Sequence, residues 1–141
     1  MEPKTVIVER VLNAPVSTVW KAITRVEEMR QWYFGLEEFR AEVGFTFNFT
    51  AGADDVQYKH LCEVTEVVPE RRLAYSWRYD GYPGNSLVSW ELEAQGGKTV
   101  LRIVHTGLES FAANGANFAP TSFTAGWTHF ADALKAYLEK A

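Results

Sequence analysis

The stretch GFTFNFT, residues 44–50, places phenylalanine at every second position, as Phe45, Phe47 and Phe49. Successive side chains of a β-strand point to opposite faces, so all three rings share one face of the strand. The same alternation recurs in Leu73, Tyr75, Trp77 and Tyr79 and in Val88, Trp90 and Leu92. The chain ends in an amphipathic helix, whose apolar stripe consists of Phe123, Trp127, Phe130, Leu134 and Tyr137 with Leu138. The sequence therefore predicts an aromatic sheet face closed by one long terminal helix.

Turn signals divide the rest of the chain into short elements. A β-branched run predicts a first strand at 4–12, and apolar residues at helical spacing predict helices at about 15–25 and 27–33. The pattern is then that of β-structure up to residue 106. Strands are expected at 37–43, 45–51, 56–68, 71–80, 86–95 and 98–106. The pair Gly96-Gly97, which lies between two alternating runs, indicates a tight hairpin.

The segment before the last helix has no consistent period. Residues 107–120 are interpreted as a loop that can include a helical turn. Thr121 or Ser122 can cap the helix that follows, which is expected to run to about residue 139. Gly126 costs that helix about 1 kcal/mol relative to Ala, and its small size permits close packing or a bend.

The order of the elements defines the fold class. A strand, two short helices, a series of antiparallel strands and a long helix make an α+β protein. If the sheet curves around the C-terminal helix, the result is a helix-grip fold with about 6–7 strands, formed by a single domain over residues 1–141.

The composition excludes several classes of function. A net charge of −4 argues against nonspecific nucleic-acid binding, and no apolar run approaches the ~20 residues that span a bilayer. The opening MEPKTVIVERV lacks the apolar core of a signal peptide, and the single Cys62 allows no intramolecular disulfide. We therefore expect a cytoplasmic protein. We expect no cofactor, because nucleotide and phosphate-binding motifs are absent. A monomer and a homodimer both remain open.

Five stretches carry a resemblance to a known family. The first, VERVLNAPVSTVWKAITRVEEMRQWY at 8–33, contains Ala14-Pro15, Val19-Trp20 and Trp32. The others are VTEVVPERRLAYSW (64–77), SLVSWEL (86–92), TVLRIVHTGL (99–108) and GWTHFADALKAYLEK (126–140). In this order they resemble the SRPBCC or START-like superfamily, and more closely the family named after the C-terminal domain of activators of heat-shock protein 90 ATPase. The resemblance implies a helix-grip fold, and for the superfamily a ligand cavity.

The aromatic face has two interpretations, a solid core and the wall of a cavity for a small hydrophobic or aromatic molecule. In the second, which we favour, the molecule lies between the sheet and the last helix and is reached past residues 107–120. Apolar contacts come from Phe47, Phe49, Tyr75, Trp77, Trp90, Phe123, Trp127 and Phe130. The polar anchors are expected among Tyr58, His60 and His105.

The titratable residues each have a structural alternative. His60 and His105 can orient a ligand or can be buried and satisfied by one hydrogen bond, whereas His129 is expected to point outward. Cys62 shares a strand face with His60 but is expected to be a small core residue rather than a nucleophile. No closely spaced pair of metal ligands is present, so we expect no metal site.

Two other functions are kept as alternatives to ligand binding. The superfamily includes cyclases, dehydratases and hydrolases, and for catalysis the best pair is His105 with Tyr58 or Tyr75. The family name implies interaction with a chaperone ATPase. That name belongs to a domain within a longer protein, whereas this chain is expected to be one domain, so a chaperone partner is the least favoured possibility.

Overall fold

The computed structural model describes residues 5–33, 36, 38–53, 56–114 and 120–140 of the protein. The elements follow in the order β1 (Val6–Leu12), α1 (Val16–Thr24), α2 (Val26–Trp32), β2 (Thr46–Ala53), β3 (Val56–Val68), β4 (Arg72–Tyr79), β5 (Ser86–Gln95), β6 (Lys98–Thr106), η1 (Leu108–Asn114) and α3 (Pro120–Lys140). The element η1 is a 3₁₀ helix.

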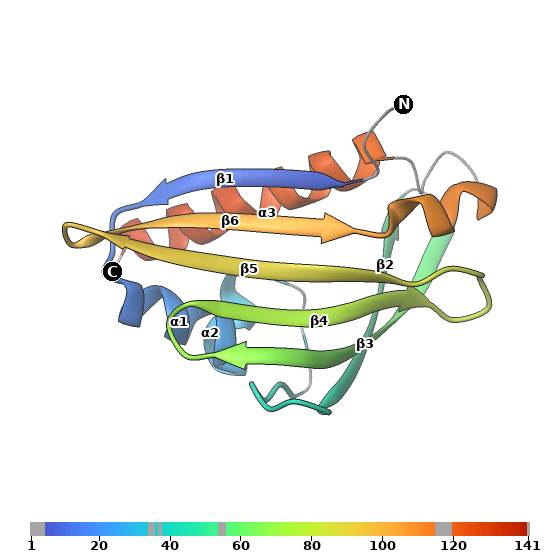
Figure 1. The fold of residues 1–141 in the computed structure, drawn as a ribbon, viewed down its shortest axis with the longest axis horizontal. Coiled ribbons are helices and arrows are strands. Elements are labelled where there is room, and N and C mark those ends of the chain that lie inside the picture. Colours follow the sequence, from blue (N-terminus) through green and yellow to red (C-terminus); the bar gives the residue numbers. More distant parts are fainter. Residues whose placement is uncertain (1–4, 34–35, 37, 54–55, 115–119, 141) are drawn as a thin grey trace.

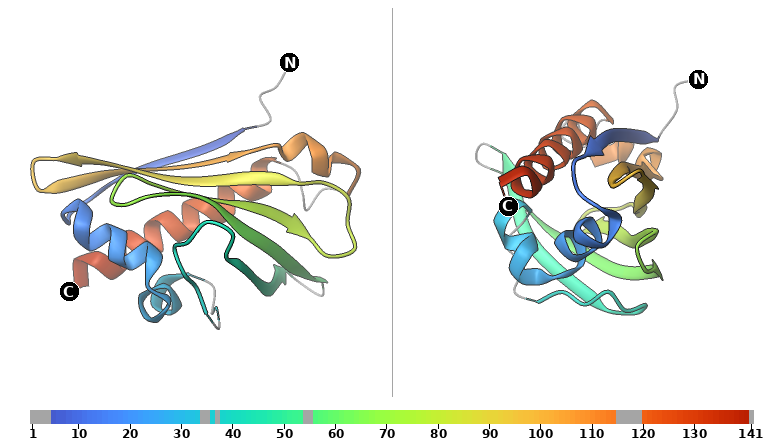
Figure 2. Two further views of the ribbon diagram at one scale, coloured as in Figure 1. Left: turned by 60° about the horizontal axis from the view of Figure 1, so that its bottom comes forward. Right: turned by 90° about the vertical axis from the view of Figure 1, so that its left-hand side faces the viewer.

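The described strands form one antiparallel sheet in the order β1-β6-β5-β4-β3-β2 (Figure 1). Strands β2 to β6 form a meander, in which each strand pairs with the next one along the chain. The last strand, β6, also pairs with β1, the first strand of the chain. The sheet curves around α3, and α1 and α2 lie across one end of it (Figure 2). Helix α3 packs on β1 and on α2. The α+β helix-grip architecture expected from the sequence is confirmed.

The Gly96-Gly97 hairpin forms as predicted. Gln95 pairs with Lys98, so the loop has two residues, and both glycines have positive φ, +54° and +85°. This is the backbone of a type I′ turn, which matches the right-handed twist of the strands that it joins and strongly favours glycine.

The expected strand at 37–43 was wrong, because residues 38–43 form no strand. Within this segment, Phe39 is only 5% exposed. Its ring packs edge-on against Phe45 and Phe47, with centroid distances of 6.1 and 5.2 Å. Ring packing therefore buries this residue without a paired strand. The first strand after α2 begins at Thr46, on the aromatic stretch itself.

The start of α3 also differs from the expectation. The helix begins at Pro120, so Thr121 and Ser122 lie inside its first turn rather than at the cap position. Proline is favoured at the first position of a helix, where an N–H would have no partner within the helix. Gly126 is exposed, and an added Cβ would meet nothing within 4 Å, so this glycine does not serve close packing.

The convex face of the sheet carries a ladder of opposite charges. Arg102 reaches Glu9 on β1 at 2.6 Å and Glu91 on β5 at 3.8 Å. Arg72 on β4 reaches Glu91 at 2.6 Å and Glu66 on β3 at 2.7 Å. Cross-strand pairs of opposite charge stabilise a sheet modestly. Their position also means that these charges lie on the face away from the aromatic interior.

Candidate functional site

The concave face of the sheet meets α3 in a cluster of aromatic rings. Trp127 of α3 lies edge-on to Trp77 and Trp90, at centroid distances of 5.3 and 5.8 Å. Phe47 and Phe49 stack along β2 at 6.5 Å, as their spacing predicted. The sequence-predicted residues Phe47, Phe49, His60, Tyr75, Trp77, Trp90, His105, Phe123 and Trp127 are buried, and Tyr58 and Phe130 are half-buried. The rings selected from the sequence are thus gathered in one interior.

A hydrogen-bonded chain connects α3 to the sheet through His105, which is fully buried. The Trp127 indole Nε1–H donates to His105 Nδ1 at 3.0 Å. Because an indole N–H can only donate, Nδ1 is an acceptor and the imidazole proton resides on Nε2. That proton faces Ser86 Oγ at 2.7 Å, and the Ser86 hydroxyl donates to the Trp77 carbonyl at 2.8 Å. Both ring nitrogens are therefore engaged.

Burial also fixes the charge of His105. Desolvation lowers the pKa of its imidazole to about 3. The side chain is neutral at physiological pH and acts as a bridge between α3 and the strands β5 and β6. Trp127 and Ser86 occupy the two ring nitrogens, so His105 makes no hydrogen bond to Tyr58 or Tyr75, and its pairing with either tyrosine in catalysis stays a prediction.

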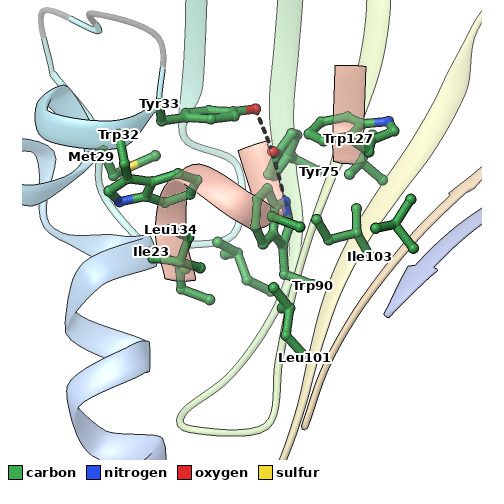
Figure 3. Close-up of a cluster of buried hydrophobic side chains, with 14 of the residues drawn as sticks. Ile23, Met29, Trp32, Tyr33, Tyr75, Trp90, Leu101, Ile103, Trp127 and Leu134 are labelled. Carbon is green, nitrogen blue, oxygen red and sulfur yellow. Dashed lines mark hydrogen bonds between the residues drawn. The ribbon is translucent and has the colours of Figure 1, made fainter. Parts of the chain in front are cut away.

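A second polar chain crosses the interior at Tyr75. The Trp90 indole N–H donates to the Tyr75 hydroxyl at 2.9 Å, and that hydroxyl lies 2.9 Å from the Tyr33 hydroxyl (Figure 3). Burial is the main reason that the pKa values of Tyr33 and Tyr75 are raised, so both phenols are protonated. Tyr75 and Trp90 belong to β4 and β5, and Tyr33 directly follows α2.

Tyr33 is the main residue that the sequence-based choice of site residues omitted. It follows α2 directly, in an extended conformation. Its ring lies 4.9 Å from that of Phe130 on α3 and 5.9 Å from that of Trp90. The sequence placed Tyr33 in a short helix next to Trp32, and the aromatic pair was a usable signal. Only the structure shows that the chain leaves the helix there and directs the ring inward.

His60 lies in a separate part of the interior. Its ring stacks on Phe49 at 4.4 Å and contacts Tyr79 at 4.7 Å. Its Nδ1 lies 2.9 Å from the Tyr58 carbonyl oxygen. Burial lowers the pKa of the imidazole to about 4. His60 and His105 both contact the ring of Trp77, which lies between them.

Cys62 and His129 take the roles expected of them. Cys62 is buried, and burial raises the pKa of its thiol, which disfavours the nucleophilic thiolate. His129 is exposed on α3. Within the described ranges, no three His, Cys, Asp or Glu side chains are grouped so that they could hold a metal ion. In the same part of the chain, no helix is both long and apolar enough to cross a membrane.

The segment expected to gate the interior is better anchored than its sequence suggested. Phe111 of η1 is fully buried and lies 5.3 Å from Tyr79 and 6.1 Å from Phe123. Gly84 allows this packing, because a Cβ there would lie 2.4 Å from the Phe111 ring. Ser110 Oγ accepts a hydrogen bond from the Asn85 N–H at 2.9 Å. The rest of the expected gate, residues 115–119, lies outside the described residues.

All fully buried side-chain nitrogen and oxygen atoms of the described residues have hydrogen-bond partners. The indoles follow this rule: Trp77 Nε1 donates to the Tyr79 hydroxyl at 2.8 Å and Trp32 Nε1 to the Ala22 carbonyl at 3.0 Å. The interior is thus apolar and internally satisfied. A polar group introduced there has to replace one of these partners.

Comparisons with known proteins agree with this architecture. The sequence model of the family described as "Activator of Hsp90 ATPase homolog 1-like protein" matches residues 13–139. The chain belongs to this family. The match begins just after β1 and covers the other strands, the helices and the aromatic stretches of the interior. A comparison with curated proteins gives no significant match.

Several solved structures are similar to this member of the activator of Hsp90 ATPase homolog 1-like family. CV1439 from Chromobacterium violaceum is 26% identical with a TM-score of 0.81, and the match covers 98% of this chain and 99% of that one. MLL2253 from Mesorhizobium loti is 26% identical with a TM-score of 0.78, covering 97% and 98%. DynU16, from the dynemicin biosynthetic locus, is 25% identical with a TM-score of 0.80. There the match covers 98% of this chain but only 48% of DynU16, so this chain spans about half of that relative.

Proposed function

We propose that the protein binds a small hydrophobic or aromatic molecule between the concave face of the sheet and α3. The observation that carries the proposal is the composition of this interior. Rings from β2, β4, β5 and α3 converge there beneath a single helix, and the charged ladder lies on the opposite face. The occurrence of the similar DynU16 in a biosynthetic locus also supports a role with small molecules.

A ligand can enter the interior only by replacing side-chain contacts between α3 and the sheet. The C-terminal half of α3 is held by hydrogen bonds from Arg10 to Asp132 at 2.8 Å and from Tyr137 to Glu28 at 2.9 Å. Closer to its N-terminal end, Trp127 contacts the sheet through rings and through its bond to His105. A flat apolar molecule can replace ring–ring contacts by ring–ligand contacts of the same kind. The side of α3 near Trp127 and Phe130 is therefore the proposed binding region.

The proposal is tested by titrating an apolar fluorescent probe into the purified protein. We expect binding in the micromolar range, about 8 kcal/mol of free energy. Trp77→Ala and Phe130→Ala should change the affinity, because both rings contact the proposed region. The matched control is Lys98→Ala, at an exposed position in the Gly96-Gly97 hairpin. No saturable binding, or equal binding by all four proteins, contradicts the proposal.

Native mass spectrometry of freshly purified protein adds a test that needs no chosen probe. A co-purified molecule below about 1 kDa, retained under gentle conditions and lost on unfolding, supports the proposal. The family name suggests stimulation of a chaperone ATPase as a parallel assay, and we expect none. The cytoplasmic location and the oligomeric state stay predictions from the sequence.

A further inference from the structure

The interior between the sheet and α3 contains no charged side chain among the described residues. The buried polar residues are His60, Ser86, Ser89, Thr99 and His105. Both histidines are neutral because burial lowers their pKa, and the arginines and glutamates of the ladder lie on the convex face. A ligand placed in this interior meets no counter-charge.

The same interior offers neutral hydroxyl groups. The phenols of Tyr33 and Tyr75 lie 2.9 Å apart, and that of Tyr79 accepts a hydrogen bond from Trp77. A phenol both donates and accepts, so Tyr75 and Tyr79 keep accepting from Trp90 and Trp77 whichever way their O–H groups point. The Tyr33 hydroxyl can turn its O–H toward a new oxygen while it accepts a hydrogen bond from Tyr75. The Tyr33 hydroxyl is the best placed of the three, since its ring also contacts Phe130 on the proposed binding region.

The absence of charged side chains from the described part of this interior and the position of the tyrosine hydroxyls together determine which ligands it can bind. A carboxylate loses its hydration in such a site and gains no cationic partner, which is costly. A neutral hydroxyl or carbonyl oxygen needs only one or two hydrogen bonds, which the tyrosines supply. A ligand without oxygen gains the ring contacts alone.

We propose that the site selects uncharged aromatic molecules that carry a hydroxyl or carbonyl oxygen, that it rejects a carboxylate of the same shape, and that the Tyr33 hydroxyl determines this preference. The inference rests on the proposed function, because it specifies which small molecules that site takes.

The experiment compares three probes on one ring system at pH 7.5: naphthalene, 2-naphthol and 2-naphthoate. Isothermal titration or intrinsic tryptophan fluorescence gives each affinity. We expect 2-naphthol to bind most tightly, naphthalene about 3–10-fold more weakly, and 2-naphthoate at least about 100-fold more weakly than 2-naphthol. If 2-naphthoate binds as tightly as 2-naphthol, this inference fails and the proposed function stands. If none of the three binds, the proposed function fails with it.

A variant tests the role of Tyr33 separately. Tyr33→Phe keeps the ring and removes the hydroxyl, so we expect naphthalene affinity to stay within about 2-fold while the preference for 2-naphthol over naphthalene disappears. The control is Tyr137→Phe, which removes a hydroxyl bonded to Glu28 outside this interior and should keep the preference. An unchanged preference in Tyr33→Phe overturns the assignment of Tyr33. Circular dichroism and the melting temperature establish that both variants are folded.

Discussion

Replacement of Trp127 by alanine is the most informative single change to the packing of α3. The side chain is 3% exposed and contacts the rings of Trp77, Trp90 and His105. A buried Trp removes roughly 200 Å² from water, and at about 25 cal/mol per Å² this burial alone is worth close to 5 kcal/mol. An alanine side chain retains a small part of this burial free energy. Neighbouring side chains that move into the vacated space recover a further part.

We therefore expect Trp127→Ala to lower the free energy of unfolding by about 3–5 kcal/mol. Part of the loss comes from His105 Nδ1, which would no longer accept the indole N–H. Trp127→Phe keeps an aromatic ring but not the N–H, so its cost should be smaller, about 1–2 kcal/mol. Urea unfolding followed by circular dichroism measures both values, provided that the transition is two-state.

The exposed His129 on the same helix supplies the control, and His129→Ala should change stability by less than about 0.5 kcal/mol. A cost below about 1 kcal/mol for Trp127→Ala would refute the reasoning. It would mean that Trp127 does not pack against the sheet as described, or that it lines an already empty space.

Three further predictions follow from individual contacts. Gly84→Ala should destabilise by about 1–3 kcal/mol, because the new Cβ would clash with Phe111 at a φ of +115°, and thermal unfolding checks this. The pKa of His105 is near 3 in the folded protein and about 6.5 in an unfolded chain, so acidification from pH 6.5 toward 3 costs stability. His105→Gln should therefore lose about 2 kcal/mol less than the wild type between pH 7 and pH 5; an equal loss contradicts a neutral, buried His105. Arg72→Ala should cost at most about 1 kcal/mol, less in high salt, since its ion pairs are partly exposed; a salt-independent loss contradicts this.

The sequence predicted the fold largely because its local signals agree with the tertiary structure. Alternating aromatics specified the buried face of β2, β4 and β5, and the Gly96-Gly97 pair specified a two-residue hairpin whose two glycines have positive φ. The signal failed at 37–43, where Phe39 is buried by neighbouring rings rather than by strand pairing. Alternation of apolar and polar residues indicates which side chains are buried. A side chain can be buried without its backbone being hydrogen-bonded to a neighbouring strand.

The sequence predicted the apolar residues of the candidate site but not the hydrogen bonds between its polar groups. The spacing of apolar residues along the strands and the last helix was sufficient to identify Trp77, Trp90 and Trp127 as inward-facing. Which polar groups meet depends on register and on where a helix ends, so the bond of Trp127 to His105 and that of Tyr33 to Tyr75 could not be derived from spacing. The role of Gly84 under Phe111 is a contact between distant segments, for which one sequence carries no direct signal.

The central claim, that a small apolar molecule binds between the sheet and α3, is tested most directly by the indole N–H signals in a ¹H–¹⁵N NMR spectrum. The chain has five tryptophans, and each contributes one indole N–H. Trp77, Trp90 and Trp127 donate into the interior, whereas Trp20 lies on α1 and is only half-buried. On titration with 2-naphthol, we predict saturable shifts of the three interior signals and little change at Trp20. Shifts confined to Trp20, or no saturable shift at any indole, would contradict the account.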